Sequence, residues 1–468
     1  MADSADLTAT ELIASYKNGV LSPVGAAEDA LRRIEQGNPV VNAFNLVDPE
    51  RALEMARASE RRWQRGEPSG LLDGVPVSIK DMLLTQAWPT LRGSLTVDPN
   101  QAWDVDSPTA ARLREHGSVW LGKTTTPELG WKGVTDSPAT GITRNPWNPE
   151  LTPGGSSGGA SAALALGMGP LAVGTDAGGS VRIPASFSGV FALKPTYGWV
   201  PHYPASAFST LAHVGPMSRS VLDAALMLDV MTGPDPRDWS TATPPAELFA
   251  STVPAADLRG TRIAFSPALG YVQVDPEVAR LVAAAVEVFT ELGAEVEEQD
   301  PGFADPVEEF HLLWYSGAAG ATEHLTEQQR ELLDPGLRRI AEEGRAMSAT
   351  DHLRGVAGRA ALGKTMGEFH QRFDLLLTPT MPITAFEAGR DVPEGWPGDS
   401  WTGWTPFTYP FNMTQQPAAS VPCGFTSAGL PVGLQVVGPR WADGRVLAAC
   451  HAFEQARPWH DRTPSLPS

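Results

Sequence analysis

Residues 153–195 constrain this chain more than any other stretch, because they join two glycine- and serine-rich loops to an apolar core segment. The first loop reads Gly-Gly-Ser-Ser-Gly-Gly over residues 154–159, and the second reads Asp-Ala-Gly-Gly-Ser over residues 176–180. The run between them is typical of a buried helix followed by a buried strand. A flexible linker is the alternative, but apolar residues throughout the stretch argue against it: Leu164, Leu166, Met168, Leu171, Val173, Val181 and Ile183.

Glycines at this density let the backbone adopt positive φ or let another group approach it closely, as a nucleophile turn lined with N–H donors requires. We therefore interpret the stretch as a catalytic centre with two candidate serines. Ser156 lies in a G-x-S-x-G sequence, which is typical of the nucleophile elbow of α/β-hydrolases. That elbow joins a strand to a helix, whereas the residues before Gly154 read as a loop, NPWNPELTP. An α/β-hydrolase-like esterase that uses Ser156 is thus the secondary hypothesis.

Ser180 is the second candidate, because it follows a predicted strand and a turn whose successive N–H groups can converge on one oxygen. The candidate general base for Ser180 is Lys80, which lies near the end of the predicted strand 74–81, GVPVSIKD. Burial lowers the pKa of a lysine by up to ~3–5 units, enough to make it a base near neutral pH. A core lysine in a salt bridge is the alternative, and composition does not decide between the two.

The whole chain, 1–468, is predicted to be a single α/β domain, because no linker-like segment divides it. Two helices are expected to begin at Pro23 and Pro49, each after a capping residue. Residues 303–372 read as mainly helical, and we interpret them as a cap. Strands, helices and a hairpin are expected in the remaining segments, at 110–124, 261–299, 373–382, 418–439 and 445–456.

Two nucleotide-binding patterns in the sequence are rejected. Residues 117–124, GSVWLGKT, match the P-loop letter for letter, but their apolar interior is predicted to be the strand itself and not a phosphate turn. Residues 167–172 imitate a dinucleotide fingerprint without the acidic residue that opens the second βαβ unit. We expect no cofactor and no metal.

The formal net charge is −19, from 54 acidic and 35 basic residues. This balance makes nucleic acid or an anionic membrane surface an improbable partner and favours a small-molecule substrate. No run of 18 apolar residues is present, so no membrane span is expected. The N-terminus lacks the features of a secretory signal, so the cytoplasm is expected, with Cys423 and Cys450 as free thiols. A homodimer is compatible with the sequence.

The segment 394–411 holds more aromatic residues than a plain connection needs. We expect it, with other aromatic residues, to wall a substrate pocket, although aromatic packing under a long loop explains the composition equally well. The candidate pocket residues are Trp88, Trp131, Trp314, Tyr315, Trp401 and Trp404.

Three long motifs, GVPVSIKD, GGSSGGASAA and GTDAGGSVRIPA, resemble the amidase signature family. Their spacing agrees, since Lys80 precedes Ser156 by 76 residues and Ser156 precedes Ser180 by 24. The likeness covers nearly the whole chain, including GKTTTPELG, ALKPTYGWVP, FDLLLTPT, PAASVPCGF and GLPVGLQVVGP. The resemblance implies the amidase signature fold, an α/β architecture with a central mixed β-sheet flanked by helices on both faces, and a Ser–cisSer–Lys triad.

Carried over to this chain, the resemblance makes Ser180 the nucleophile, Ser156 the bridging serine in a cis peptide after Gly155, and Lys80 the general base. It implies that Ser157 supports Lys80 and that two further residues hold the turn, Asp176 and Arg182. The implied oxyanion hole consists of the amides of Ala177, Gly178, Gly179 and Ser180.

Two departures from the family pattern are expected to reshape the substrate channel. The family often has glycine in an N-x-T-G-x-P stretch, where this chain reads NMTQQP over residues 412–417. Met82 stands where a small polar residue is common. Asn412 also begins a glycosylation sequon, which we dismiss in a chain without a secretion signal.

The resemblance implies an amidase that hydrolyses C–N bonds other than peptide bonds through an acyl-enzyme, with anilides, carbamates or aryl esters as related substrates. A glutamine-hydrolysing subunit of a tRNA-dependent amidotransferase is the alternative. Against it, residues 310–325 do not resemble the substrate region of such subunits, and the acidic composition lacks a tRNA footprint. A silent binding protein is disfavoured because Lys80, Ser156 and Ser180 are all present.

Overall fold

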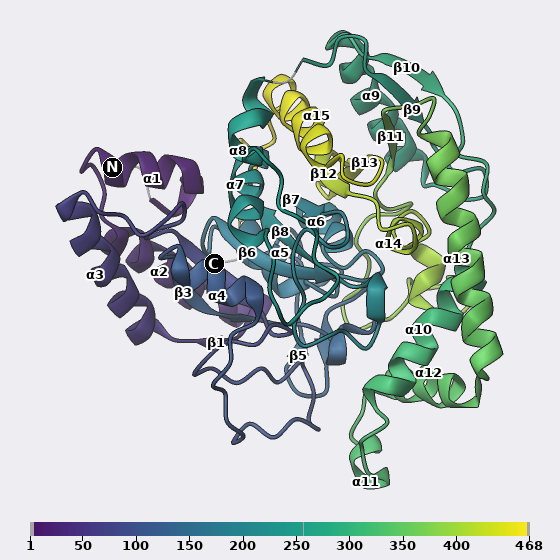
Figure 1. The fold of residues 1–468 in the computed structure, drawn as a ribbon, viewed down its shortest axis with the longest axis horizontal. Helices are drawn as coiled ribbons and strands as arrows, with labels where there is room; N and C mark the ends of the chain where they lie inside the picture. The colour runs from purple at the N-terminus through teal and green to yellow at the C-terminus, as the bar shows by residue number, and fades with distance from the viewer. Residues whose placement is uncertain (1–3, 256, 466–468) are drawn as a thin grey trace.

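The computed structural model describes residues 4–255 and 257–465, and a mixed sheet of eleven strands runs through its centre (Figure 1). The strands follow the order β1-β3-β2-β6-β8-β7-β12-β13-β11-β9-β10. Their bounds are β1 Phe44–Val47, β2 Pro76–Lys80, β3 Val119–Thr124, β6 Leu171–Asp176, β7 Phe191–Lys194, β8 His213–Ser218, β9 Arg262–Phe265, β10 Glu295–Glu298, β11 Leu375–Pro379, β12 Ala418–Phe425 and β13 Pro431–Val437. A separate pair is formed by β4 Asp136–Ser137 and β5 Gly141–Ile142.

The sheet is parallel in two places and antiparallel between them, and the edge strand β1 is also antiparallel to β3. Strands β3, β2 and β6 run parallel to one another, as do β11, β9 and β10. The strands that connect these groups, from β6 through β8, β7, β12 and β13 to β11, are all antiparallel neighbours. The predicted α/β class with a mixed sheet is therefore confirmed.

Helices cover both faces of the sheet, and the alternation of side chains along the strands explains why. In β6, Leu171 and Val173 join the apolar cluster under α7, whereas Ala172 joins the one under α5 and α6. The first face carries α4 Pro108–Glu115, α7 Val221–Met231, α9 Pro276–Glu291 and α15 Asp443–Ala456. The second carries α2 Pro23–Val41, α3 Pro49–Arg65, α5 Gly158–Ala165 and α6 Arg182–Ser188.

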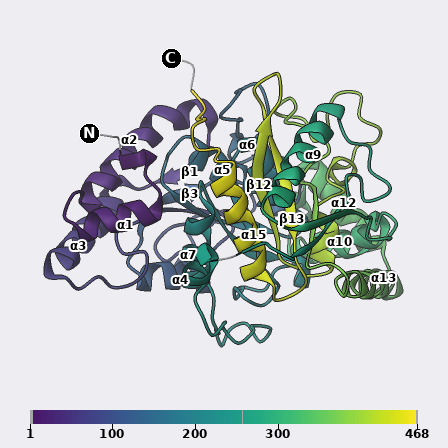
Figure 2. The ribbon, with the colours of Figure 1, turned by 90° about the horizontal axis from the view of Figure 1, so that it is seen from above.

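The predicted helical region 303–372 consists of α10 Val307–Ala321, α11 Glu327–Arg330, α12 Pro335–Ala346 and α13 Ala349–Phe369. These helices lie at the opposite end of the molecule from α2 and α3 (Figures 1 and 2). Their apolar residues form one cluster with Trp131, Phe208 and Trp401 from other segments. We propose that residues 1–468 form one domain in which these helices are a cap.

The N-terminal segment differs from the two helices that the sequence predicts. A third helix, α1 Ala9–Lys17, begins after a capping box between Thr8 and Glu11. Strand β1 lies between α2 and α3, and it is too short for its periodicity to be recognised. The shortest remaining elements are η1 Ser4–Asp6, η2 Glu128–Gly130, η3 Ser209–Leu211, η4 Val253–Ala255, η5 Trp401–Trp404, α8 Phe249–Thr252 and α14 Tyr409–Met413. Within residues 4–255 and 257–465, none of the helices has the length and hydropathy that crossing a bilayer requires.

The segment that imitates a P-loop is strand β3, so its rejection as a phosphate site is confirmed. Lys123 is fully buried there and donates to the Leu83 carbonyl and the Thr90 hydroxyl, both at 2.8 Å. Its ammonium also pairs with Asp81 at 3.4 Å. Burial lowers the pKa of Lys123 to about 8, while Asp81 acts in the opposite direction. This lysine anchors the loop after β2 to the sheet.

Replacing Lys123 by Met leaves the Asp81 carboxylate buried without its cation, which costs about 3–5 kcal/mol of unfolding free energy. Urea unfolding measures the loss. Lys17→Met, at an exposed position, is the matched control and leaves the stability within about 0.5 kcal/mol. The double variant Lys123→Met/Asp81→Asn recovers part of the loss. Wild-type stability of Lys123→Met would contradict the assigned role of the pair.

Candidate active site

Lys80 is the last residue of β2, and its ammonium lies among three hydroxyl groups. Its Nζ is 2.6 Å from Ser156 Oγ and 2.9 Å from both Ser157 Oγ and Thr175 Oγ1. Ser157 precedes the first turn of α5, and Thr175 lies near the end of β6. Because β2 and β6 are parallel neighbours, the sheet brings these segments to one point. Lys80 is fully buried there.

The surroundings of Lys80 favour its neutral form. Burial lowers its pKa to about 7, opposed only by the more distant charge of Asp176. No described carboxylate forms an ion pair with Lys80, which excludes the alternative of a salt-bridged core lysine. Ser157 Oγ also lies 3.3 Å from the Thr175 carbonyl, so its proton points there and its oxygen accepts from Lys80. The lone pair of a neutral Lys80 is then left for the proton of Ser156.

The two candidate serines line one cavity of about 170 Å³. The Gly155–Ser156 peptide bond is cis, as the resemblance implies. Ser156 faces Lys80, whereas the Ser180 hydroxyl makes no hydrogen bond to any described residue and is left for a substrate. The Ser157 amide donates to the Ser180 carbonyl at 3.0 Å and so ties the two loops together.

The nucleophile-elbow interpretation of Ser156 lacks its structural context. No strand lies between residues 143 and 157, so Ser156 is not in a strand–turn–helix junction. His202 lines the same cavity, but its ring makes no hydrogen bond to Ser156 or Ser180. The lysine, which contacts Ser156 directly, is therefore the base that the geometry offers.

The turn before Ser180 is built around the buried carboxylate of Asp176. This carboxylate accepts from the amides of Gly179 at 2.7 Å and Val181 at 3.2 Å, and it pairs with Arg182 at 3.0 Å. Burial alone would raise the pKa of Asp176, but the Arg182 guanidinium holds it well below its usual range. The charged pair thus keeps the turn in one shape.

The amide of Gly179 differs from the expectation for the oxyanion hole, because its N–H is already bonded to Asp176. Glycine is nevertheless required at this position, since its φ is +128° and a Cβ would lie 2.4 Å from Thr408 Oγ1. The other predicted amides donate to no described residue and remain for an oxyanion: Ala177, Gly178 and Ser180.

Asn412 completes this network, a role that the sequence did not indicate, since Asn412 stood out there only in the NMTQQP stretch and as the start of a sequon. Its Nδ2 donates to Asp176 Oδ1 at 2.8 Å, and its Oδ1 accepts from Arg182 at 2.6 Å. The side chain is fully buried, so it is inaccessible to glycosylation. Three residues later, Gln415 stands where the family often has glycine, and it adopts a left-handed φ of 61°.

None of the six candidate aromatic residues lines the cavity at Ser180. Four of them are buried in the cluster behind it: Trp131, Trp314, Trp401 and Trp404. Tyr315 packs against that cluster, and Trp88 lies in another core cluster, where its indole donates to Asp48. Phe208 does line the cavity, and it stacks on Trp314 with ring centroids 3.8 Å apart. The tryptophans therefore support the wall without forming it.

Met82, one of the departures from the family pattern, is among the lining residues, with Arg92, Leu129 and Gly130 on the neighbouring segments. No group of three or more His, Cys, Asp or Glu side chains in the described part of the chain could hold a metal ion.

Comparison with known proteins places this chain among amide-cleaving enzymes. The profile of the family described as Amidase matches residues 26–447. An acylamidase from Rhodococcus erythropolis is 40% identical over 466 residues, which cover 98% of this chain and 97% of the relative. The A subunit of the glutamyl-tRNA(Gln) amidotransferase from Gloeobacter violaceus is 36% identical over 95% of each chain. A bacterial aryl acylamidase of the amidase signature family superposes with a TM-score of 0.91 at 32% identity, over 97% of each chain.

A fluorophosphonate probe tests the order of the two serines and the state of Lys80. We expect the phosphonyl adduct on Ser180, formed at a rate that rises with pH and is half-maximal near pH 7, because only neutral Lys80 accepts the proton. Lys80→Met reduces the rate at least ~100-fold, as expected for loss of a general base. An adduct on Ser156, or full labelling of Lys80→Met, would contradict the assignment.

Asn412→Ala removes a donor to Asp176 and an acceptor for Arg182. We expect it to lower the unfolding free energy by about 1–3 kcal/mol and to slow labelling of Ser180 even where the variant is fully folded. Asn38→Ala, on α2, is a control that loses two hydrogen bonds to the backbone of Phe44, at the start of β1. A folded Asn412→Ala protein that labels as fast as wild type would show that this side chain does not position the turn.

Proposed function

This chain belongs to the amidase family, whose members cleave amides, and we propose that it does so through Ser180, Ser156 and Lys80. The observation that carries this proposal is the contact of 2.6 Å between Ser156 Oγ and a buried lysine without a carboxylate partner. A buried lysine with a pKa near 7 is a base at neutral pH and, once protonated, an acid of matching strength.

In the first half of the reaction, Ser180 Oγ attacks the carbonyl carbon. Ser156 takes the proton of Ser180 while its own proton passes to Lys80, which becomes an ammonium. The carbonyl oxygen gains negative charge and is bound by the free amides of Ala177, Gly178 and Ser180. Each such donor is worth about 2.7–4 kcal/mol of barrier in comparable sites.

The tetrahedral intermediate then collapses with breakage of the C–N bond. Ser156 donates a proton to the leaving nitrogen and regains one from Lys80, so the amine departs neutral and Ser180 is left as an ester. Water repeats the attack through the same relay and releases the acid. Proton delivery to the nitrogen as the bond breaks suits amides, whose amine is otherwise a poor leaving group.

Small-molecule amides are the proposed substrates, with anilides, carbamates and aryl esters as related classes. The acylamidase and aryl acylamidase relatives support a free-standing enzyme, and the net charge of −19 disfavours binding of tRNA. Because the chain is also similar to an amidotransferase component, the second candidate function is glutamine hydrolysis within such a complex. A cytoplasmic location and a homodimer belong to the proposal as well.

Purified protein without any partner is expected to hydrolyse 4-nitroacetanilide, with release of 4-nitroaniline followed by absorbance. Ser180→Ala is expected to lower kcat/KM at least ~1000-fold, because it removes the nucleophile. Ser161→Ala, a buried serine in α5, is the matched control. Ammonia release from glutamine alone, without turnover of any anilide, carbamate or aryl ester, would favour the amidotransferase candidate.

A further inference from the structure

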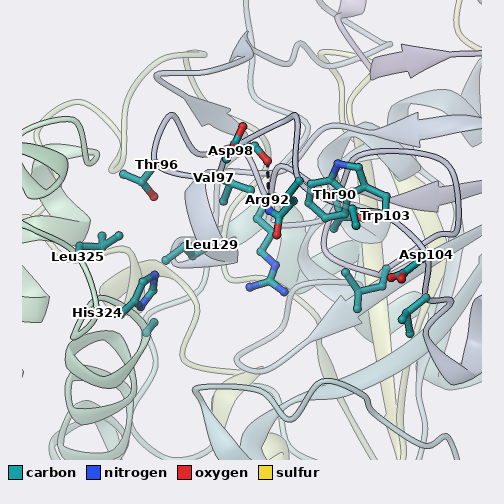
Figure 3. A pocket seen from close by; sticks show the side chains of 15 residues that line it. Thr90, Arg92, Thr96, Val97, Asp98, Trp103, Asp104, Leu129, His324 and Leu325 are labelled. Atoms are coloured by element: carbon teal, nitrogen blue, oxygen red, sulfur yellow. Dashed lines mark hydrogen bonds between the residues drawn. The ribbon is translucent and has the colours of Figure 1, made fainter.

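A second cavity of about 420 Å³ adjoins the one at Ser180, because three residues line both: Arg92, Leu129 and Ala321. Figure 3 shows the outer cavity with the Arg92 side chain extending into its middle, between Leu129 and His324 on one side and Trp103 and Asp104 on the other. Arg92 thus stands at the boundary between the catalytic cavity and the outer one.

The backbone holds Arg92 firmly in this place. Arg92 and Leu129 adopt left-handed φ angles of 56° and 52°, and the Leu129 amide donates to the Arg92 carbonyl at 2.8 Å. A Cβ on the next residue, Gly93, would lie 2.6 Å from the Thr126 carbonyl, so the two segments are in close contact. Non-glycine residues with positive φ are uncommon and cluster at functional sites.

The guanidinium of Arg92 is a cation without a partner. Among the described residues it makes no hydrogen bond and no ion pair, although it is half-buried. The acid that influences it, Asp81, already pairs with Lys123 at 3.4 Å and accepts from Asn45 at 2.9 Å. His202, on the same cavity, is neutral because burial lowers its pKa to about 4. A partly desolvated arginine with five free donors favours an anion, and its planar fork matches a carboxylate.

The leaving group of the substrate is the part that reaches this arginine. The leaving nitrogen must lie beside Ser156, which returns the proton. The residue over Ser156 is Gly130, where a Cβ would lie 3.3 Å from Ser156 Oγ. Gly130 follows Leu129, which is bonded to Arg92. An amine part that leaves from Ser156 therefore passes this segment toward Arg92 and the outer cavity.

We propose that Arg92 binds a carboxylate on the amine part of the substrate, so that the preferred substrates are N-acyl derivatives of amino acids in the broad sense, aromatic aminobenzoates included. This inference rests on the proposed function of Ser180, Ser156 and Lys80. The outer cavity accepts the rest of the amine part. Its exposed rim carries Asp98 and Asp104, which disfavour a second anionic group there.

Two matched anilides test the proposal: 4-acetamidobenzoate carries the carboxylate, and 4-methylacetanilide is its neutral counterpart. Wild type is expected to prefer the carboxylate. Arg92→Gln places another unbranched side chain at this backbone position. In this variant, the ratio of the kcat/KM for 4-acetamidobenzoate to that for 4-methylacetanilide is expected to fall about 10- to 100-fold. Arg92→Lys retains part of the preference. Arg280→Gln, an exposed arginine on α9, keeps the wild-type ratio.

Binding separates recognition from chemistry. Calorimetry of 4-acetamidobenzoate with Ser180→Ala gives its Kd, and Ser180→Ala/Arg92→Gln is expected to raise that Kd about tenfold or more. Succinanilic acid, with its carboxylate on the acyl part, serves as the positional control and is expected to be affected little by Arg92→Gln.

An unchanged substrate ratio in Arg92→Gln, an unchanged Kd, or a larger effect on succinanilic acid would overturn the inference. If 4-methylacetanilide is still hydrolysed in that case, the proposed function stands. If wild type hydrolyses neither anilide and Ser180 is not labelled by fluorophosphonate, the proposed function itself fails.

Discussion

Burial of a lysine without a counter-ion is the constraint on which the rest of this site depends. Lys80 is supported only by three neutral hydroxyls, and the loss of hydration lowers its pKa to about 7. Such a group is stable only where the surrounding segments are fixed, because a polar atom without a partner is costly in the interior. The parallel strands β2 and β6 and the start of α5 supply this rigidity.

Two buried lysines on neighbouring strands show how an ion-pair partner changes what a lysine can do. Lys123, on β3 beside β2, is as deeply buried as Lys80. Its ammonium, however, pairs with Asp81, and its contacts hold the loop after β2 against the sheet. Arg182 and Asp176 are likewise buried and fully paired, and with Asn412 they hold the turn that presents Ser180. Charge pairing therefore builds the frame of the site, and within it Lys80, which pairs with no described carboxylate, has its pKa lowered to about 7 and can act as a neutral base.

Chemistry and recognition come from different parts of the fold. The reactive groups lie at the ends of central strands and on the turns next to them, whereas the cavity is lined largely by connecting segments near residues 82–92, 129–130 and 202–212. The tryptophans of the 394–411 segment stabilise one wall from behind. Loops of this kind vary without disturbing the sheet, so we expect substrate preference to depend on lining residues such as Met82 and Arg92.

The sequence by itself determined the class of fold and the helix starts at Pro23 and Pro49, and it proposed the triad of Lys80, Ser156 and Ser180, because these features lie in continuous motifs or follow a local rule of capping. Only the tertiary structure decided which polar groups have hydrogen-bond partners and which side chains line the cavity. Asn412 bonds to Asp176 across 236 residues of chain, the Gly179 amide is already bonded, and the candidate tryptophans lie behind the cavity. Those outcomes depend on packing between segments far apart in the chain, which no local pattern of residues records.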